Sequence, residues 1–256
     1  MIPEYEFREM ARTYGVPISS IERDYAQNWL LSALSGKMKM VLKGGTGIRK
    51  VYIEGYRFSD DLDFTLMEEY TLTQIDNALR LALREAREFS GIGFLDEVKL
   101  ESVNNGFTAS IFFRILRVSG NPIRIKIDLT AQSREQILVE PQMRLIIHPY
   151  SDTLRSEILS YRLEEVFSEK IRSLFERTRP RDLYDVWRLK DLDIEDPEII
   201  YKKFKFKDLP FNIESVQRRE LSFNRAWASS LMHQLKELPD FTLVYTETLD
   251  YLKSIF

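Results

Sequence analysis

The sequence predicts an α+β fold, with an α/β domain over residues 1–150 and a helical domain over residues 151–256. Three observations support this prediction. The chain has 256 residues, enough for one large domain or two small ones. Runs rich in Val, Ile, Phe and Thr lie in mid-chain between Asn, Gly and Pro residues, as strands joined by turns do. From about Arg162 onward, apolar residues recur with the period of an α-helix.

The N-terminal part of the chain predicts helices on both sides of one short strand. Apolar residues recur at helical spacing over residues 4–35, and Ser19 or Ser20 could cap a helix start. The apolar run over residues 38–42 has the length of a short strand. A glycine turn and a short helical stretch, which reaches Ile53, follow it. The expected order is therefore helix, strand, glycine turn, helix.

The next part of the chain predicts a sheet. Residues 62–66 alternate as a strand does, and Thr71 with Gln74 has the spacing of a capping box that starts a long amphipathic helix. Three β-rich runs separated by turn residues then predict an antiparallel meander, over residues 94–103, 107–118 and 123–130.

The second half of the chain predicts helices. A helical stripe of apolar residues begins near Arg162, and Pro180 is expected to open a further helix because proline suits the first helical turn. Asp196-Pro197 and Leu209-Pro210 are expected breaks. The remaining helices are expected over residues 214–238 and from residue 241 onward.

Composition excludes several classes of protein. The chain has no cysteine, which removes disulfide scaffolds, iron–sulfur clusters and thiol nucleophiles, and its two histidines cannot form a zinc site of several imidazoles. With 37 basic and 40 acidic side chains the net charge is −3, so nucleic-acid contact would need a local basic surface. The N-terminus lacks a signal-peptide pattern, and no apolar run approaches the ~20 residues that span a bilayer. We therefore expect a cytoplasmic protein with no membrane segment.

The densest chemical signal lies in the first half of the chain. Lys43-Gly44-Gly45-Thr46 opens a predicted helix, where two glycines would let the backbone approach a phosphate. Asp61 and Asp63 flank one residue of a predicted strand, so both carboxylates are expected on the same face. Adjacent carboxylates repel each other unless a cation neutralises them, and oxygen ligands suit Mg²⁺ or Mn²⁺. Asp128, on a later strand, would complete a two-metal site for displacement at phosphorus.

The same residues also have ordinary structural interpretations. Asp61 and Asp63 could belong to a solvated acidic turn before a strand, because such turns are common. Lys170 could be a solvated helix lysine, and Tyr184 and Trp187 fit the apolar stripe of an amphipathic helix.

In combination, these motifs resemble the nucleotidyltransferase superfamily with a polymerase-β-like core, in which a Gly-Gly or Gly-Ser helix start precedes an Asp-x-Asp strand and a third aspartate. The fuller pattern, Lys-Gly-Gly-Thr at 43–46 and Arg-Phe-Ser-Asp-Asp-Leu-Asp-Phe at 57–64, is similar to the AbiEii/AbiGii-type toxin nucleotidyltransferases. Lys170 and the Arg-Asp-x-Tyr-Asp segment at 181–185 extend the similarity, which spans about residues 41–189. The resemblance implies a polymerase-β-like core with a mixed or antiparallel sheet, followed by a helical domain.

The resemblance also implies roles for individual residues. Asp61 and Asp63 would hold the metal ions, with Asp128 as a less tightly patterned third ligand. Lys170 would offset charge on the phosphates, and Asp182 would orient Lys170, a base or the acceptor. The implied nucleotide-binding residues are Gly44, Gly45, Thr46, Arg57, Ser59, Lys170, Arg181 and Asp185.

The function these residues imply is transfer of a nucleoside monophosphate from an NTP to an acceptor, with Mg²⁺ or Mn²⁺ as cofactor. By resemblance, the acceptor is the 3′ end of tRNA, the effect is growth inhibition, and a separate antitoxin is encoded nearby. Two alternatives stay open here: a nucleotidyltransferase that modifies a protein or a small molecule, and a nucleotide-binding regulator without turnover. Two basic clusters are candidate RNA contacts, Arg177, Arg179 and Arg181, and Lys202, Lys203, Lys205 and Lys207.

Overall fold

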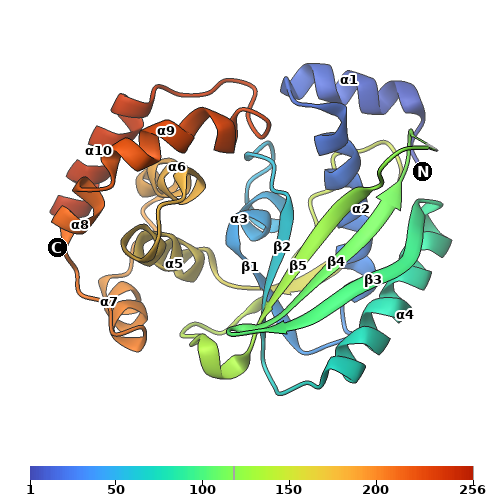
Figure 1. The fold of residues 1–256 in the computed structure, drawn as a ribbon, viewed down its shortest axis with the longest axis horizontal. Helices are drawn as coiled ribbons and strands as arrows, with labels where there is room; N and C mark the ends of the chain where they lie inside the picture. The colour runs from blue at the N-terminus through green and yellow to red at the C-terminus, as the bar shows by residue number, and fades with distance from the viewer. Residues whose placement is uncertain (118, 256) are drawn as a thin grey trace. The chain divides into compact units, whose positions relative to one another are not determined.

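The computed structural model describes residues 1–117 and 119–255, which form two compact units. The first unit comprises Met1–Glu135 and Pro141–Tyr161. The second comprises Gln136–Glu140 and the chain from Arg162 onward. The sheet and helices α1–α4 belong to the first unit, and helices α5–α10 belong to the second (Figure 1).

A seven-stranded mixed sheet forms the centre of the first unit within the described residues. Its strand order is β3-β4-β5-β2-β1-β7-β6. The central strand β2 pairs in parallel with β5 and antiparallel with β1, and β1 pairs in parallel with β7. The strands are β1 (Met40–Lys43), β2 (Asp61–Leu66), β3 (Gly93–Val103), β4 (Gly106–Arg114), β5 (Ile123–Thr130), β6 (Gln142–Leu145) and β7 (Glu157–Ser160).

One face of this sheet is buried against two helices, α2 (Ile18–Leu34) and α4 (Leu72–Ser90). In β5, for example, Ile125, Ile127 and Leu129 are buried, while the residues between them are more exposed. This period of two places apolar side chains in the core and polar side chains on the opposite face. The candidate catalytic carboxylates lie on that opposite face.

The first two helices are α1 (Glu4–Tyr14) and α2, as expected for the N-terminal region. The expected cap at Ser19 or Ser20 is wrong, because α2 already begins after Pro17, whose carbonyl accepts a hydrogen bond from Ser20 N at 2.8 Å. The capping box of α4 is confirmed: Thr71 N donates to Gln74 Oε1 at 2.8 Å, and Gln74 N donates to Thr71 Oγ1 at 3.3 Å.

Several expected boundaries differ from the observed ones. The strand expected over 107–118 ends at Arg114, and Val118 lies outside the described residues. After β1 the chain forms a short helix, α3 (Gly44–Gly47), that continues as a π-helical turn over Ile48–Tyr52. Strands β6 and β7 were not predicted, because four residues are too few to show a period of two.

The second unit is helical, as its period predicts. Pro180 occupies the first turn of its helix, as expected. The helices expected over 214–238 are present as two, separated at Arg218–Arg219, but the second ends at Leu231 rather than at Leu238. The helices are α5 (Leu163–Glu176), α6 (Pro180–Leu189), α7 (Pro197–Phe206), α8 (Ile213–Gln217), α9 (Glu220–Leu231) and α10 (Phe241–Ser254), with a 3₁₀ turn at Lys190–Leu192.

Candidate active site

Strand β2 carries the two carboxylates of the Asp-x-Asp motif on one face of the sheet. Asp61 and Asp63 flank Leu62, which is completely buried, whereas both aspartates are partly exposed. Their shared face is opposite α2 and α4, as the alternation of a strand requires.

The neighbouring strand brings two more charged residues to the same face. In the parallel pairing of β2 with β5, Asp63 lies directly opposite Asp128, and Asp61 lies directly opposite Lys126. Lys126 Nζ lies 2.7 Å from Asp128 Oδ2. Three carboxylates and one lysine therefore occupy the corners of a four-residue square, which we call the β2–β5 square.

Strand β1 adds a second lysine beside this square. Lys43 lies directly opposite Asp63 in the antiparallel pairing of β1 with β2. Its Nζ lies 3.9 Å from Glu135 Oε2 and 5.8 Å from the centre of the Tyr161 ring. Lys43 and Lys126 were not among the predicted site residues, since only the strand register shows that they flank the carboxylates.

The two glycines of the motif are required by close approaches to other site residues. Gly44 has a φ of +71°, and a Cβ built there would lie 2.6 Å from Asp63 Oδ2. A Cβ at Gly45 would lie 2.5 Å from Arg57 Nη2. A side chain at either position would displace the Asp63 carboxylate or the Arg57 guanidinium, which is itself almost completely buried.

The loop before β2 is held by hydrogen bonds to its backbone. Thr46 is completely buried, and its hydroxyl donates to the carbonyl of Asp61. Gln27 Nε2, from α2, donates to the carbonyls of Ser59 at 3.0 Å and Asp60 at 3.2 Å. In the structure, Thr46 therefore orients the start of β2, and Ser59 belongs to a corner fixed by α2.

A buried charge cluster lies beneath this loop. Asp24, on α2, accepts hydrogen bonds from Arg49 Nε at 2.6 Å, Lys50 Nζ at 2.6 Å and the Tyr150 hydroxyl at 2.8 Å. Burial lowers the pKa of Lys50 to about 8, although the nearby Asp24 carboxylate opposes that shift. Burial alone would raise the pKa of Asp24, but Arg49 and Lys50 hold it well below its ordinary value.

Arg49 connects this cluster to the motif residues. Its Nη1 donates to the carbonyl of Tyr56, and its guanidinium lies 3.6 Å from the centre of the Phe58 ring. Because Tyr56 and Phe58 flank Arg57, the cluster fixes the backbone that presents the Arg57 side chain. The sequence analysis did not predict this buried cluster. The adjacent cations Arg49 and Lys50 were the feature of the sequence that could have indicated it.

The remaining predicted site residues belong to the second unit. Lys170, on α5, is buried, and its Nζ lies 2.8 Å from both Asp182 Oδ1 and Asp185 Oδ2 of α6. Arg177 Nε donates to Asp182 Oδ2, also at 2.8 Å. Arg181, on the same helix, is partly exposed. The structure thus brings the lysine together with both aspartates of the Arg-Asp-x-Tyr-Asp segment.

The charges of this cluster are closely balanced. Burial alone would raise the pKa of Asp182, but the positive charges of Lys170 and Arg177 hold it well below its ordinary value. Asp182 is therefore an ionised carboxylate at neutral pH. Its Oδ1 holds the Lys170 ammonium at 2.8 Å.

One of the two basic clusters needs correction. Lys203 is completely buried, and its Nζ lies 2.7 Å from Glu165 Oε1 and 3.0 Å from Glu169 Oε1. It cannot contact RNA, since its side chain has no exposed surface. Lys202 and Lys205, by contrast, lie on the exposed side of the same helix.

The donor atoms of the β2–β5 square suit a divalent cation. The carboxylates are oxygen ligands at adjacent positions, and Thr108, directly opposite Asp128 on β4, has a buried hydroxyl oxygen without a hydrogen-bond partner among the described residues. Across residues 1–117 and 119–255, however, no three acidic or histidine side chains are gathered closely enough to form a metal site. In the structure, Asp128 Oδ2 instead lies 2.7 Å from Lys126 Nζ.

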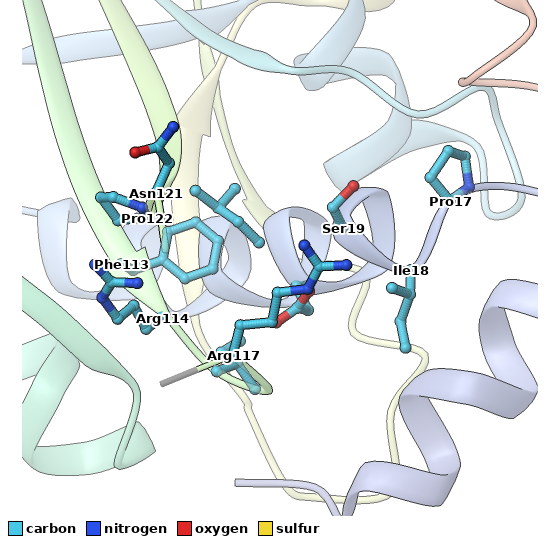
Figure 2. Close-up of a pocket in the computed structure, with 11 residues that line it drawn as sticks. Pro17, Ile18, Ser19, Phe113, Arg114, Arg117, Asn121 and Pro122 are labelled. Carbon is cyan, nitrogen blue, oxygen red and sulfur yellow. The ribbon is translucent and has the colours of Figure 1, made fainter. Parts of the chain in front are cut away.

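A separate cavity of about 250 Å³ lies in the first unit at the first turn of α2. Figure 2 shows Arg117 extending toward the first turn of α2 beside Ser19, with Phe113 and Pro122 on the strand side. None of the predicted site residues is among the described residues that line it.

No helix in the described part of the chain has the length and apolar composition that a bilayer crossing requires.

Comparison of structures identifies a related fold. The nucleotidyltransferase toxin MenT4 from Mycobacterium tuberculosis H37Rv superposes with a TM-score of 0.66 at 16% identity, over 99% of this chain and 90% of that chain. Two further structures have TM-scores too low to support an argument. They are an antigenic nucleotidyltransferase-like protein from Paracoccidioides brasiliensis (0.39, 13% identity, 92% of this chain and 96% of that chain) and the CdnE cyclic dinucleotide synthase from Elizabethkingia meningoseptica (0.24, 12% identity, 89% and 87%).

Comparison of sequences identifies the family. No curated protein matches the chain. The family model described as the nucleotidyl transferase AbiEii toxin of the type IV toxin–antitoxin system matches residues 29–252, which is most of the chain. The predicted α+β fold class and the resemblance to AbiEii-type toxins are both confirmed. The chain belongs to the AbiEii family of toxins, and it is an NTP-dependent nucleotidyltransferase.

Proposed function

We propose that this enzyme transfers a nucleoside monophosphate from an NTP to the 3′-terminal hydroxyl of tRNA, and that it does so in the cytoplasm, opposed by an antitoxin. The observation that carries the proposal is the juxtaposition of Asp61, Asp63 and Asp128 on two paired strands, next to the Gly44-Gly45 turn. The first unit would supply the catalytic core, and the second a helical domain with its own buried lysine.

Asp61, Asp63 and Asp128 are the residues that would hold Mg²⁺ or Mn²⁺. When bound, such a cation neutralises the carboxylates and the phosphates that approach them, and it stabilises negative charge that grows on the transferring phosphoryl group. The oxygen-only donor set and the unpartnered Thr108 hydroxyl beside Asp128 support this assignment.

The chain's own residues would act on the nucleotide and the acceptor. The Gly44-Gly45 turn leaves room beside Asp63, so the backbone can approach a phosphate there. The guanidinium of Arg57, held over Gly45, would bind phosphate oxygens. The carboxylate oxygen of Asp128 that does not hold the cation would take the proton of the attacking hydroxyl.

In this reaction the acceptor oxygen forms a bond to the α-phosphorus while the bond from that phosphorus to the bridging oxygen breaks, and pyrophosphate leaves. Lys170 would offset charge on the leaving phosphates. Asp182 and Asp185 would orient its ammonium, and Arg181, on α6 with these two aspartates, would add a second cation. The tRNA acceptor is supported by the resemblance to the family.

Transfer of label from NTPs labelled at the α-phosphate tests this proposal. Wild-type protein with Mg²⁺ or Mn²⁺ should label total tRNA from at least one of the four NTPs. Asp63→Asn should abolish labelling, because the neutral amide cannot hold the cation, whereas Asp96→Asn, at an exposed position on β3, should not. Periodate-oxidised tRNA, which lacks an intact 3′-terminal diol, should accept no label.

Each part of the proposal can fail separately. Full activity of Asp63→Asn would contradict the metal assignment. Label in oxidised tRNA would contradict the 3′ terminus, and label only in protein or small molecules from a cell extract would contradict the tRNA acceptor.

A further inference from the structure

Helix α7 has two chemically different sides. Its buried side carries Ile199, Ile200, Lys203 and Phe204. Its other side carries Tyr201, Lys202, Lys205 and Phe206, at spacings of one, four and five residues, all of them exposed. Tyr201 and Lys205 are four residues apart, and so are Lys202 and Phe206, so the members of each pair are neighbours on the helix surface. We call this exposed side, together with Lys207 just after the helix, the α7 face.

The buried side fixes α7 within the second unit. Lys203 Nζ pairs with Glu165 and Glu169, which are both on α5, and also contacts the carbonyl of Gln136. Glu169 directly precedes Lys170 in the chain. The α7 face is therefore carried on a helix that is attached by buried ion pairs to the helix of the candidate catalytic lysine.

The start of α7 is equally well defined. Asp196 Oδ1 accepts hydrogen bonds from Glu198 N at 2.9 Å and Ile199 N at 3.1 Å, and Pro197 occupies the first turn. With its N-terminus capped and one side buried, the helix presents its other side in a fixed arrangement.

The α7 face combines exposed aromatic rings with ammonium groups. Tyr201 is 62% exposed and Phe206 is 40% exposed. Lys205 Nζ lies 6.0 Å from the centre of the Tyr201 ring, and Lys207 Nζ lies 5.3 Å from the centre of the Phe206 ring. Each ring therefore has a cation beside it, in a chain whose net charge is −3.

We propose that the α7 face binds unpaired nucleotides of the acceptor RNA, an inference that rests on the proposed function. Bases would stack on the rings of Tyr201 and Phe206, and phosphates would pair with Lys205 and Lys207. Alternation of aromatic and basic side chains is the arrangement that single-stranded nucleic acid requires, because every base has a stacking face and every phosphate a negative charge.

The spacing of the two rings indicates more than one nucleotide. Tyr201 and Phe206 are five residues apart, which is about 7.5 Å along a helix axis. Two rings at that separation would contact different bases rather than the two sides of one. A protein partner would instead bury the same rings in a contact that depends little on salt, which makes salt dependence the distinguishing measurement.

Equilibrium binding of total tRNA, measured without NTP, tests the α7 face. Lys205→Gln combined with Lys207→Gln should weaken binding about tenfold and reduce the salt slope by about one to two, measured between about 50 and about 200 mM salt. Tyr201→Ala combined with Phe206→Ala should weaken binding at least about fivefold and leave the slope unchanged. A matched control, Arg218→Gln combined with Lys253→Gln, removes two exposed charges elsewhere in the second unit and should change binding less than about twofold.

The outcomes separate this inference from the proposed function. If wild-type protein binds and labels tRNA but both α7 variants bind like the control, the α7 face does not bind RNA, whereas the proposed transfer to tRNA is supported. If wild-type protein neither binds nor labels tRNA, tRNA is not the acceptor, and the proposal that the α7 face binds this RNA is also contradicted. Unchanged thermal melting of each variant shows that lost binding is not lost folding. In the transfer assay, the α7 variants should raise the KM for tRNA and keep the kcat of wild type.

Discussion

Replacement of Lys126 by glutamine should strengthen the binding of Mn²⁺ to this enzyme. Lys126 occupies one corner of the β2–β5 square, opposite Asp61, and its ammonium lies 2.7 Å from Asp128 Oδ2. A divalent cation that takes the Asp128 carboxylate must break this ion pair and must tolerate a neighbouring positive charge. Glutamine keeps a polar side chain, one atom shorter, and removes both the ion pair and the positive charge.

The size of the effect follows from the exposure of the pair. The Lys126 side chain is 37% exposed and that of Asp128 is 35% exposed. Solvent-exposed ion pairs of this kind stabilise a protein by about 0.2–1 kcal/mol, which is the cost of breaking this one. A unit charge and a divalent ion roughly 5 Å apart, the spacing of neighbouring strands, repel by about 1.7 kcal/mol in water. Because the lysine can turn toward solvent, the combined effect should lie between about 0.5 and about 2 kcal/mol, which is about 2- to 30-fold in affinity.

The assay is a titration of the protein with Mn²⁺ in which free Mn²⁺ is measured by electron paramagnetic resonance. Lys99→Gln is the matched control, since Lys99 is on β3, two strands away from Asp128, and is paired with Glu97. Lys126→Gln should bind Mn²⁺ more tightly than both wild type and this control, and high salt should reduce the difference. Equal or weaker binding by Lys126→Gln would refute the reasoning and would identify Lys126 as a residue that positions Asp128 for the cation.

Two further predictions concern stability. Asp24→Asn should destabilise the protein by about 3–5 kcal/mol in urea unfolding, because it leaves two buried cations without their shared carboxylate, while Asp250→Asn, at an exposed helix position, should change stability by less than about 0.5 kcal/mol. The pKa values of Asp24 and Asp182 are lower in the folded protein than the ordinary 3.8, so the stability they contribute is present above about pH 4 and is lost as the pH falls further. The melting temperature should therefore drop steeply as the pH falls below about 4. A melting temperature independent of pH in that range would contradict the lowered pKa values of Asp24 and Asp182.

The carboxylate face could be predicted from the sequence because its signals are local. Asp61 and Asp63 are two residues apart, and the period of a strand alone places them on one face. The two motif glycines were predicted for a similar reason, since close backbone approach is a property of the residue itself. These features need no knowledge of which strands pair.

Lys43 and Lys126 could not be predicted in this way. Lys126 faces Asp61 only because β2 and β5 pair in one particular register, and the two residues are far apart in the chain. A shift of that register by one residue would turn Lys126 to the buried face. The sequence therefore indicates that a lysine and an aspartate alternate on β5, but the tertiary pairing determines what they contact.

The buried lysine of α7 shows the same limit. Lys202, Lys203, Lys205 and Lys207 look alike in the sequence, and their clustering suggested one basic surface. The structure divides them, because Lys203 meets Glu165 across the interface with α5 while its neighbours face outward. Local composition cannot show which lysine has a buried partner, since that partner lies on another helix.

The two lysine–aspartate clusters differ in burial, and this difference determines whether water or an ion can replace one of the charged partners. The pair of Lys126 and Asp128 is partly exposed, so water and ions can replace either partner at a small cost. Lys170 is buried with Asp182 and Asp185, so removal of any member leaves an uncompensated charge away from water. A cation site that must load and release its ion at each turnover needs the first kind of pair. A lysine that must present one ammonium in a fixed position at every turnover needs the second. The difference in burial, rather than in residue type, therefore separates the two roles that we assign to these lysines.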